Sequence, residues 1–169
     1  MTLPGERVLA LRVVEWCREM KRQRFQEATG KNDGPPSVRF MGGRQEPWCG
    51  HFVACGFREC GAPLPFDVVP SPKVANPLAG VQFMEDVTKK RGWWHPGTAG
   101  IAPGDILFLL TRGLSDTGPG RHVAIVEQAL PTSVITVDGN WGHMVGSAVR
   151  ALSDKQISGY ARVPDPLKN

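Results

Sequence analysis

The fold prediction starts from one helical stretch of the sequence, Glu46-Pro-Trp-Cys-Gly-His-Phe-Val-Ala-Cys-Gly56. Proline is favoured at the first position of a helix, and apolar residues follow it at helical spacing, namely Trp48, Phe52, Val53 and Phe57. A helix from about residue 47 to residue 59 puts Cys49 in its first turn, where free N–H groups and the helix dipole favour a thiolate. Cys49 is therefore a candidate nucleophile, although a free cysteine is most commonly a small buried apolar residue.

Length and composition point to one soluble domain, residues 1–169. Hydrophobic residues make up 41% of the chain and charged residues 21%. The net charge of +4 favours an anionic partner, but the basic residues form no stripe of the kind that binds nucleic acid. We expect a monomer that has no nucleic-acid partner and no membrane partner. The first residues do not resemble a secretory signal, so we expect a protein made in the cytoplasm without a signal peptide.

Hydrophobic periodicity predicts helices in the first half of the chain and strands in the second half. Helices are expected at residues 5–28, 37–41, 47–59 and 81–90. Strands are expected at residues 106–110, 122–127, 134–138 and 158–163. The proline-rich residues 62–80 and the glycine-rich residues 113–120 are expected to be loops. This order predicts an α+β fold with N-terminal helices packed on a small antiparallel sheet.

The predicted hairpin near residues 130–131 offers partners for a cysteine nucleophile. It places His122 opposite the segment 138–140, where Asp138 and Asn140 alternate along one strand and can share a face. An imidazole base needs an acceptor to fix its tautomer and direction, and either residue could supply it. Alternatively, His122 merely starts a strand and residues 138–140 form a turn.

Four segments in order resemble the CHAP family, the cysteine, histidine-dependent amidohydrolases and peptidases. The segments are Glu46-Pro-Trp-Cys-Gly-His-Phe-Val, Ala102-Pro-Gly-Asp-Ile-Leu-Phe, Arg121-His-Val-Ala-Ile-Val-Glu and Thr136-Val-Asp-Gly-Asn-Trp. They cover most of residues 46–142. The resemblance implies a papain-like fold of the NlpC type and cleavage of peptidoglycan amide bonds.

The resemblance also assigns roles to residues. The nucleophile falls on Cys49 and the base on His122. The residue that orients the histidine falls on Asp138, where many relatives carry glutamate, and the asparagine of the motif falls on Asn140. The calcium-binding run that some phage members carry before the cysteine is absent, so we expect no metal and no cofactor.

Other polar and aromatic residues receive weaker assignments. Trp48, Trp141 and the pair Trp93-Trp94 are candidate walls of a substrate groove, with a place in the core as the equal alternative. His51 is expected on the helix surface. A zinc site built from Cys49, His51, Cys55 and Cys60 is disfavoured, because these side chains leave one helix in different directions. Cys17, Cys55 and Cys60 are expected to be buried or idle thiols, with a disulfide left open.

The sequence therefore favours a peptidoglycan hydrolase, either an N-acetylmuramoyl-L-alanine amidase or an endopeptidase, that acts at the bacterial cell wall. A phage lysin, a virion-associated lysin or a secreted antibacterial effector would fit. The alternatives are a thiol amidase that acts on another peptide, and a catalytically silent wall-binding module of the same fold.

Overall fold

The computed structural model describes residues 7–67, 80–111 and 120–166. These residues form four helices and one six-stranded sheet, which confirms the predicted α+β class. The helices are α1 (Val8–Gln23), α2 (Pro35–Met41), α3 (Cys49–Glu59) and α4 (Val81–Lys90). The strands are β1 (Trp94–Pro96), β2 (Ile106–Thr111), β3 (Gly120–Ala129), β4 (Ser133–Trp141), β5 (Met144–Ala151) and β6 (Ile157–Ala161).

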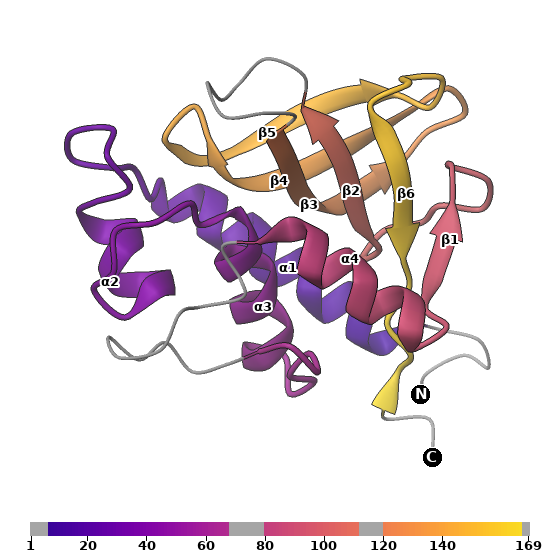
Figure 1. The fold of residues 1–169 in the computed structure, drawn as a ribbon, viewed down its shortest axis with the longest axis horizontal. Coiled ribbons are helices and arrows are strands. Elements are labelled where there is room, and N and C mark those ends of the chain that lie inside the picture. Colours follow the sequence, from indigo (N-terminus) through magenta and orange to yellow (C-terminus); the bar gives the residue numbers. More distant parts are fainter. Residues whose placement is uncertain (1–6, 68–79, 112–119, 167–169) are drawn as a thin grey trace.

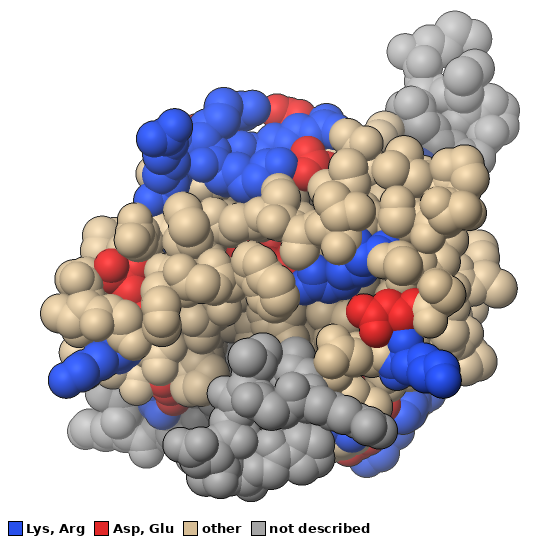
Figure 2. Space-filling model, turned by 90° about the horizontal axis from the view of Figure 1, so that it is seen from above, with Lys and Arg blue, Asp and Glu red and all other residues tan. Residues whose placement is uncertain are grey.

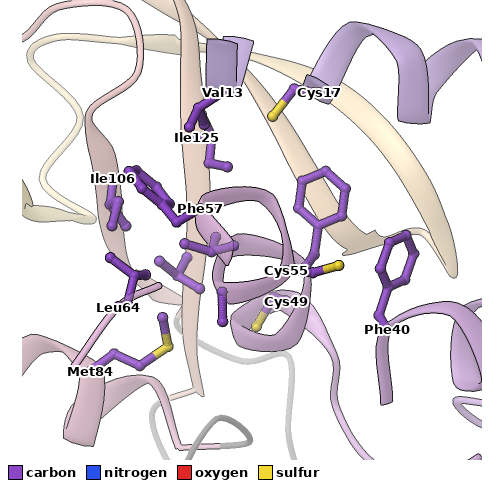
Figure 3. Close-up of a cluster of buried hydrophobic side chains, with 14 of the residues drawn as sticks. Val13, Cys17, Phe40, Cys49, Cys55, Phe57, Leu64, Met84, Ile106 and Ile125 are labelled. Atoms are coloured by element: carbon purple, nitrogen blue, oxygen red, sulfur yellow. The ribbon is translucent and has the colours of Figure 1, made fainter. Parts of the chain in front are cut away.

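The strands pair antiparallel throughout, in the order β1-β6-β2-β3-β4-β5. In Figure 1 the sheet lies above helices α1, α3 and α4. The main apolar cluster fills the space between these helices and one face of the sheet. Figure 3 shows this cluster, with α3 at its centre between side chains from α1, α2, α4, β2 and β3.

The central strands are buried on both faces. Ile106 and Phe108 belong to the main cluster, whereas Leu107 and Leu109 belong to a smaller cluster on the opposite face. Burial on two faces explains why residues 106–110 are apolar without alternation.

Helix α3 is almost entirely enclosed, because its residues 49–57 are all buried. It begins at Cys49 with Trp48 as its cap, so Pro47 precedes the helix and is not its first residue as the sequence predicted. Strand β4 approaches the start of α3 closely at Gly139. A Cβ added there would overlap the side chain of Phe52 and lie 3.1 Å from the indole of Trp48.

Two strands lie where the sequence predicted none, β1 and β5. Strand β5 follows β4 through a two-residue turn in which Gly142 and His143 have φ of 59° and 66°. Positive φ at both central residues gives the twist that a tight hairpin needs. Helix α1 is shorter than predicted: it ends at Gln23 and is capped by Arg24, which has φ of 53°. The predicted loop at residues 113–120 lies almost wholly outside the described residues, as does most of the loop at residues 62–80.

Candidate active site

Cys49 is the first residue of α3, and its thiol is buried against the start of β3. Burial alone would raise the pKa of this thiol. The hydrogen bond and charge of His122, together with the backbone N–H groups of Val123 and Gly50, nevertheless hold the pKa below its ordinary value. These are the surroundings that turn a cysteine into a nucleophile.

His122 lies near the beginning of β3, opposite Leu109 of β2, and is only 6% exposed. Burial lowers the pKa of its imidazole, but hydrogen bonds to Asp138 and Cys49 raise it to about 9. A shift of opposite sign on each partner favours the thiolate–imidazolium form of the pair.

Asp138 holds the other side of the imidazole. Its Oδ2 lies 2.7 Å from Nε2 of His122, and its side chain is fully buried. Because a carboxylate only accepts hydrogen bonds, Nε2 carries the proton. That leaves Nδ1 as the nitrogen that faces the thiol of Cys49.

The register of the sheet brings these groups together. Val126 pairs with Thr136 and Ile125 with Val137 across β3 and β4. Val137 and Gly139 face the helices, so Thr136 and Asp138 lie on the other face of the sheet. The predicted hairpin is present, and the register shifts by one residue between Val126 and Gln128. This shift gives the pairing in which His122 and Asp138 both lie on the outer face.

Asn140 does not share the role of Asp138. Its φ is 58°, which interrupts the alternation of β4, and its Nδ2 donates to Oδ1 of Asn32 at 3.2 Å. No hydrogen bond joins Asn140 to His122 in the part of the chain that the structure describes. The expectation that Asn140 lies close by and assists the imidazole therefore has no hydrogen bond to His122 to support it.

Trp48 and Trp141 have different positions in the structure, whereas the sequence left both as candidates for either a groove wall or the core. Trp48 is fully buried and stacks on Phe40, so it is a core residue and not a groove wall. Trp141 is 39% exposed, and its ring centroid lies 5.5 Å from that of His122. Its position fits a wall of the site. Trp93 and Trp94 are partly buried and pack against the main cluster.

Trp48 is fixed by Glu27, which the sequence analysis did not single out. Nε1 of Trp48 donates to Oε1 of Glu27 at 2.7 Å, and the fully buried carboxylate also accepts from the backbone N–H of Asn32 and contacts Nδ1 of His143. Glu27 thus connects the residue before the nucleophile to the segment after α1 and to the β4–β5 turn. A glutamate in a loop carries no sequence signal for such a role.

His51 is buried, which corrects the prediction that it lies on the helix surface. Its Nε2 lies 2.8 Å from Oε1 of Glu46, and its Nδ1 has no hydrogen-bond partner. Burial lowers the pKa of this imidazole against the opposing effect of Glu46. Its contact with Glu46 holds the segment that leads into Cys49.

The other three cysteines are free thiols. Burial raises the pKa of Cys17, Cys55 and Cys60, the opposite direction from Cys49. Figure 3 shows that the sulfur atoms of Cys17, Cys49 and Cys55 do not converge. Among the described residues no group of three or more His, Cys, Asp or Glu side chains could hold a metal ion.

A cavity of about 180 Å³ opens on the outer face beside the triad. It is lined by Leu109, Trp141, Ala148, Val149, Arg150, Asp154 and Gln156. Figure 2 looks on to the molecule from the sheet side, and most of that surface carries no charged residue. A second cavity of about 200 Å³, between α1 and residues 162–165, contains no residue of the triad. The first cavity also lacks a triad residue, but its lining includes Trp141, whose ring neighbours His122, and Arg150, which bonds Asp138, so it is the candidate for substrate contact.

The start of α3 also supplies hydrogen-bond donors. The first N–H of α3 that donates to the preceding turn is that of Phe52, which bonds the carbonyl of Trp48 at 2.9 Å. The N–H of Gly50 is one of the groups that lower the pKa of Cys49. The N–H of Cys49, at the first position of α3, belongs to the turn whose N–H groups have no partner within the helix. A donor at this place can stabilise an oxyanion that forms on an attacked carbonyl.

No protein-family model, curated protein or solved structure matches this chain. In the described part of the chain, no helix is both long enough and apolar enough to cross a bilayer. The site itself brings together a cysteine with a lowered pKa, an imidazole with a raised pKa and a buried carboxylate that bonds the imidazole.

Proposed function

We propose that this protein is a cysteine-dependent amide hydrolase with a papain-like fold, and that it cleaves peptidoglycan. The main support is the 2.7 Å contact of His122 with Asp138, together with the lowered pKa of Cys49, to which the hydrogen bond and charge of His122 contribute. A nucleophile at a helix start, a base and an acceptor that orients the base form the triad that acyl transfer requires.

The first half of the reaction forms a thioester. The thiolate of Cys49 attacks the amide carbonyl, and the N–H of Cys49 stabilises the oxyanion. Nδ1 of the His122 imidazolium then gives its proton to the amide nitrogen, the C–N bond breaks, and the amine leaves. Asp138 keeps the ring in place and stabilises its charge throughout.

The second half releases the product. Neutral His122 takes a proton from water at Nδ1, and the hydroxide attacks the thioester carbonyl. The C–S bond breaks, which frees a carboxylic acid and restores the thiolate of Cys49 with the imidazolium of His122. Every step uses side chains of this chain alone, so no metal or cofactor is required.

Peptidoglycan is the proposed substrate because of the four CHAP-like segments. Three of them carry the triad, at Cys49, His122 and Asp138, and the fourth carries Asp105. Asp105 is fully buried and accepts hydrogen bonds from Arg7 and Arg162. It also accepts from the backbone N–H of Ala102 at 2.8 Å, and so it holds the turn before β2. The proposed site of action is the bacterial cell wall, reached in a phage particle, at phage release or by secretion, with the protein acting as a monomer.

Digestion of purified sacculi tests the proposal. Wild-type protein should release fragments whose masses show new amino and carboxyl ends and no new reducing sugar ends, and the masses identify the amide that is cut. The variant C49A, which should remain folded, should release none. C60S is the matched control. It changes the half-buried thiol of Cys60, whose pKa is raised, and this variant should digest sacculi as wild type does.

Two other results would redirect the proposal. If sacculi stay intact while a thiol-reactive probe still labels Cys49 selectively, the protein is a thiol amidase for a different peptide. If Cys49 shows no selective reactivity and sacculi stay intact, the chain is a catalytically silent module, and the proposed hydrolase is wrong.

A further inference from the structure

Asp138 holds two cationic partners on one oxygen atom. Oδ2 accepts from Nε2 of His122 at 2.7 Å and from Nη2 of Arg150 at 2.5 Å. Oδ1 accepts from the hydroxyl of Thr136 at 2.5 Å. The carboxylate is fully buried, so these three donors replace its water.

Arg150 is itself buried, with 7% of its side chain exposed. It comes from β5, where it pairs with Val134 and stands two residues from Ala148, the partner of Thr136. Its guanidinium lies 4.8 Å from the ring centroid of Trp141, the residue whose other neighbour is His122. Packing on Trp141 and burial together fix the position of this cation.

A permanent positive charge at this place acts on the triad. Since Arg150 and His122 share one oxygen atom, the guanidinium lies within about 5 Å of the imidazole by the sum of the two bond lengths. A guanidinium stays protonated at every working pH. If Arg150 served only to hold Asp138 in place, a neutral hydrogen-bond donor would be enough, because Thr136 already bonds the other carboxylate oxygen.

We infer that Arg150 is a positioning residue of the active site, which acts through Asp138 and sets the pH range in which Cys49 and His122 form their ion pair. The inference rests on the proposed thiolate–imidazolium pair. The role belongs to a residue of a strand outside the CHAP-like segments, and it adds a fourth member to the triad.

The sign of the effect follows from the charges. A nearby cation disfavours the imidazolium of His122 and favours the thiolate of Cys49, so Arg150 lowers the pKa of both groups. Removing its charge should move both upward. Besides His122 and Arg150, the residue that bonds Asp138 is Thr136 on β4, whose hydroxyl carries no charge. Asp154 lines the same cavity as Arg150 and is the acidic residue on its open side.

The variant R150Q isolates the charge, because glutamine keeps an N–H donor for Asp138 but is neutral. The probe is the rate at which iodoacetamide alkylates Cys49, followed by mass analysis of the Cys49 peptide across pH. In R150Q both limbs of the profile should move to higher pH, by at least about half a pH unit. R150K keeps the charge, and its limbs should stay with those of wild type.

R162Q is the matched control. Arg162 follows β6 and bonds Asp105, a fully buried carboxylate just before β2, through Nε at 3.0 Å and Nη2 at 2.7 Å. It should lose stability much as R150Q does and leave the alkylation profile unmoved. If R150Q folds only in part, the titration is repeated for all variants in sucrose, which favours compact states.

If R150Q is folded and its alkylation profile has the same acid and alkaline limbs as wild type, the inference is wrong and the proposed hydrolase stands. Equal shifts in R150Q and R162Q would also overturn it, because they would reflect general loosening. If wild-type Cys49 is not alkylated faster than an ordinary thiol at neutral pH, the proposed ion pair fails and the inference fails with it.

Discussion

The 2.7 Å contact between Nε2 of His122 and Oδ2 of Asp138 joins two side chains that are 16 residues apart and both buried. It fixes the tautomer of the imidazole, because the proton on Nε2 must point to the carboxylate. Nδ1 is then turned to Cys49. The geometry gives the orienting role to Asp138 and places Asn140 against Asn32.

Asp138→Asn should slow hydrolysis by about 10²-fold, because an amide stabilises imidazolium less well and can hold the wrong tautomer. Asn140→Ala removes a hydrogen bond that does not reach the ring and should cost less than about fivefold. Steady-state rates of both variants on the same sacculi check this ordering. A larger loss in Asn140→Ala would assign the orienting role to the amide.

The pH dependence of hydrolysis should be bell-shaped, with an alkaline limb near pH 9. The hydrogen bonds of His122 raise its pKa to about 9, so the imidazolium that protonates the leaving amine is lost above that pH. The acid limb should lie below the ordinary thiol value of about 8.5, because the pKa of Cys49 is lowered. A rate that instead keeps rising through pH 9 would indicate a neutral thiol–imidazole pair.

The same ion pair should make stability depend on pH. The pKa of His122 is raised in the folded state above its unfolded value of about 6.5, so the stabilisation is complete below pH 6.5 and lost as pH rises through about 9. Chemical denaturation at several pH values should show this loss in wild type. Its magnitude should be smaller in His122→Gln, which cannot titrate.

Replacement of Trp48 and of Trp141 should distinguish a core residue from a residue that contacts substrate. Trp48→Phe leaves Oε1 of buried Glu27 without its 2.7 Å donor and should lower the free energy of unfolding by about 1–3 kcal/mol. Trp141→Phe should leave stability nearly unchanged and raise KM, because Trp141 is exposed beside the cavity. Thermal melts and steady-state kinetics of both variants distinguish the roles, and a reversed pattern would contradict them.

Gly139 should not tolerate a side chain. In Gly139→Ala the new methyl would overlap Phe52, so β4 or α3 must shift, at a cost of about 1–3 kcal/mol and with displacement of neighbouring Asp138. Gly146 of β5 is the matched control, since a Cβ there meets its nearest atom at 3.6 Å. Denaturant unfolding and activity should fall in Gly139→Ala and hold in Gly146→Ala. Equal effects would mean that the close approach of β4 to α3 does not matter.

The parts of the fold that could be predicted are those with strong local patterns. The apolar run at residues 106–110 and the alternation in residues 134–138 mark buried strands whatever surrounds them. The spacing of the hairpin places His122 opposite the segment that holds Asp138, but it does not by itself put both side chains on one face. The pairing of Ala129 with Val134 beside the turn would put them on opposite faces, and the register shift between Val126 and Gln128 brings them to the same face.

The parts that could not be predicted depend on contacts between distant segments. The Gly142-His143 turn differs from the usual Asn-Gly signal, so β5 and its Arg150 had no marker. A positive φ at Asn140 broke the alternation that the prediction assumed. Which side of α3 faces solvent is decided by the sheet and by α1 and α2, so the burial of Trp48 and His51 could not be deduced from helical spacing alone.

An acyl-enzyme on Cys49 can be trapped during the reaction. Wild-type protein is mixed with sacculi, quenched in acid within the first turnover, and digested for mass analysis. We expect the peptide that contains Cys49 to gain the mass of a cell-wall acyl fragment through a thioester that hydroxylamine removes. Absence of any acyl group on Cys49 while sacculi are being cut, or cutting by Cys49→Ala at the wild-type rate, would contradict it.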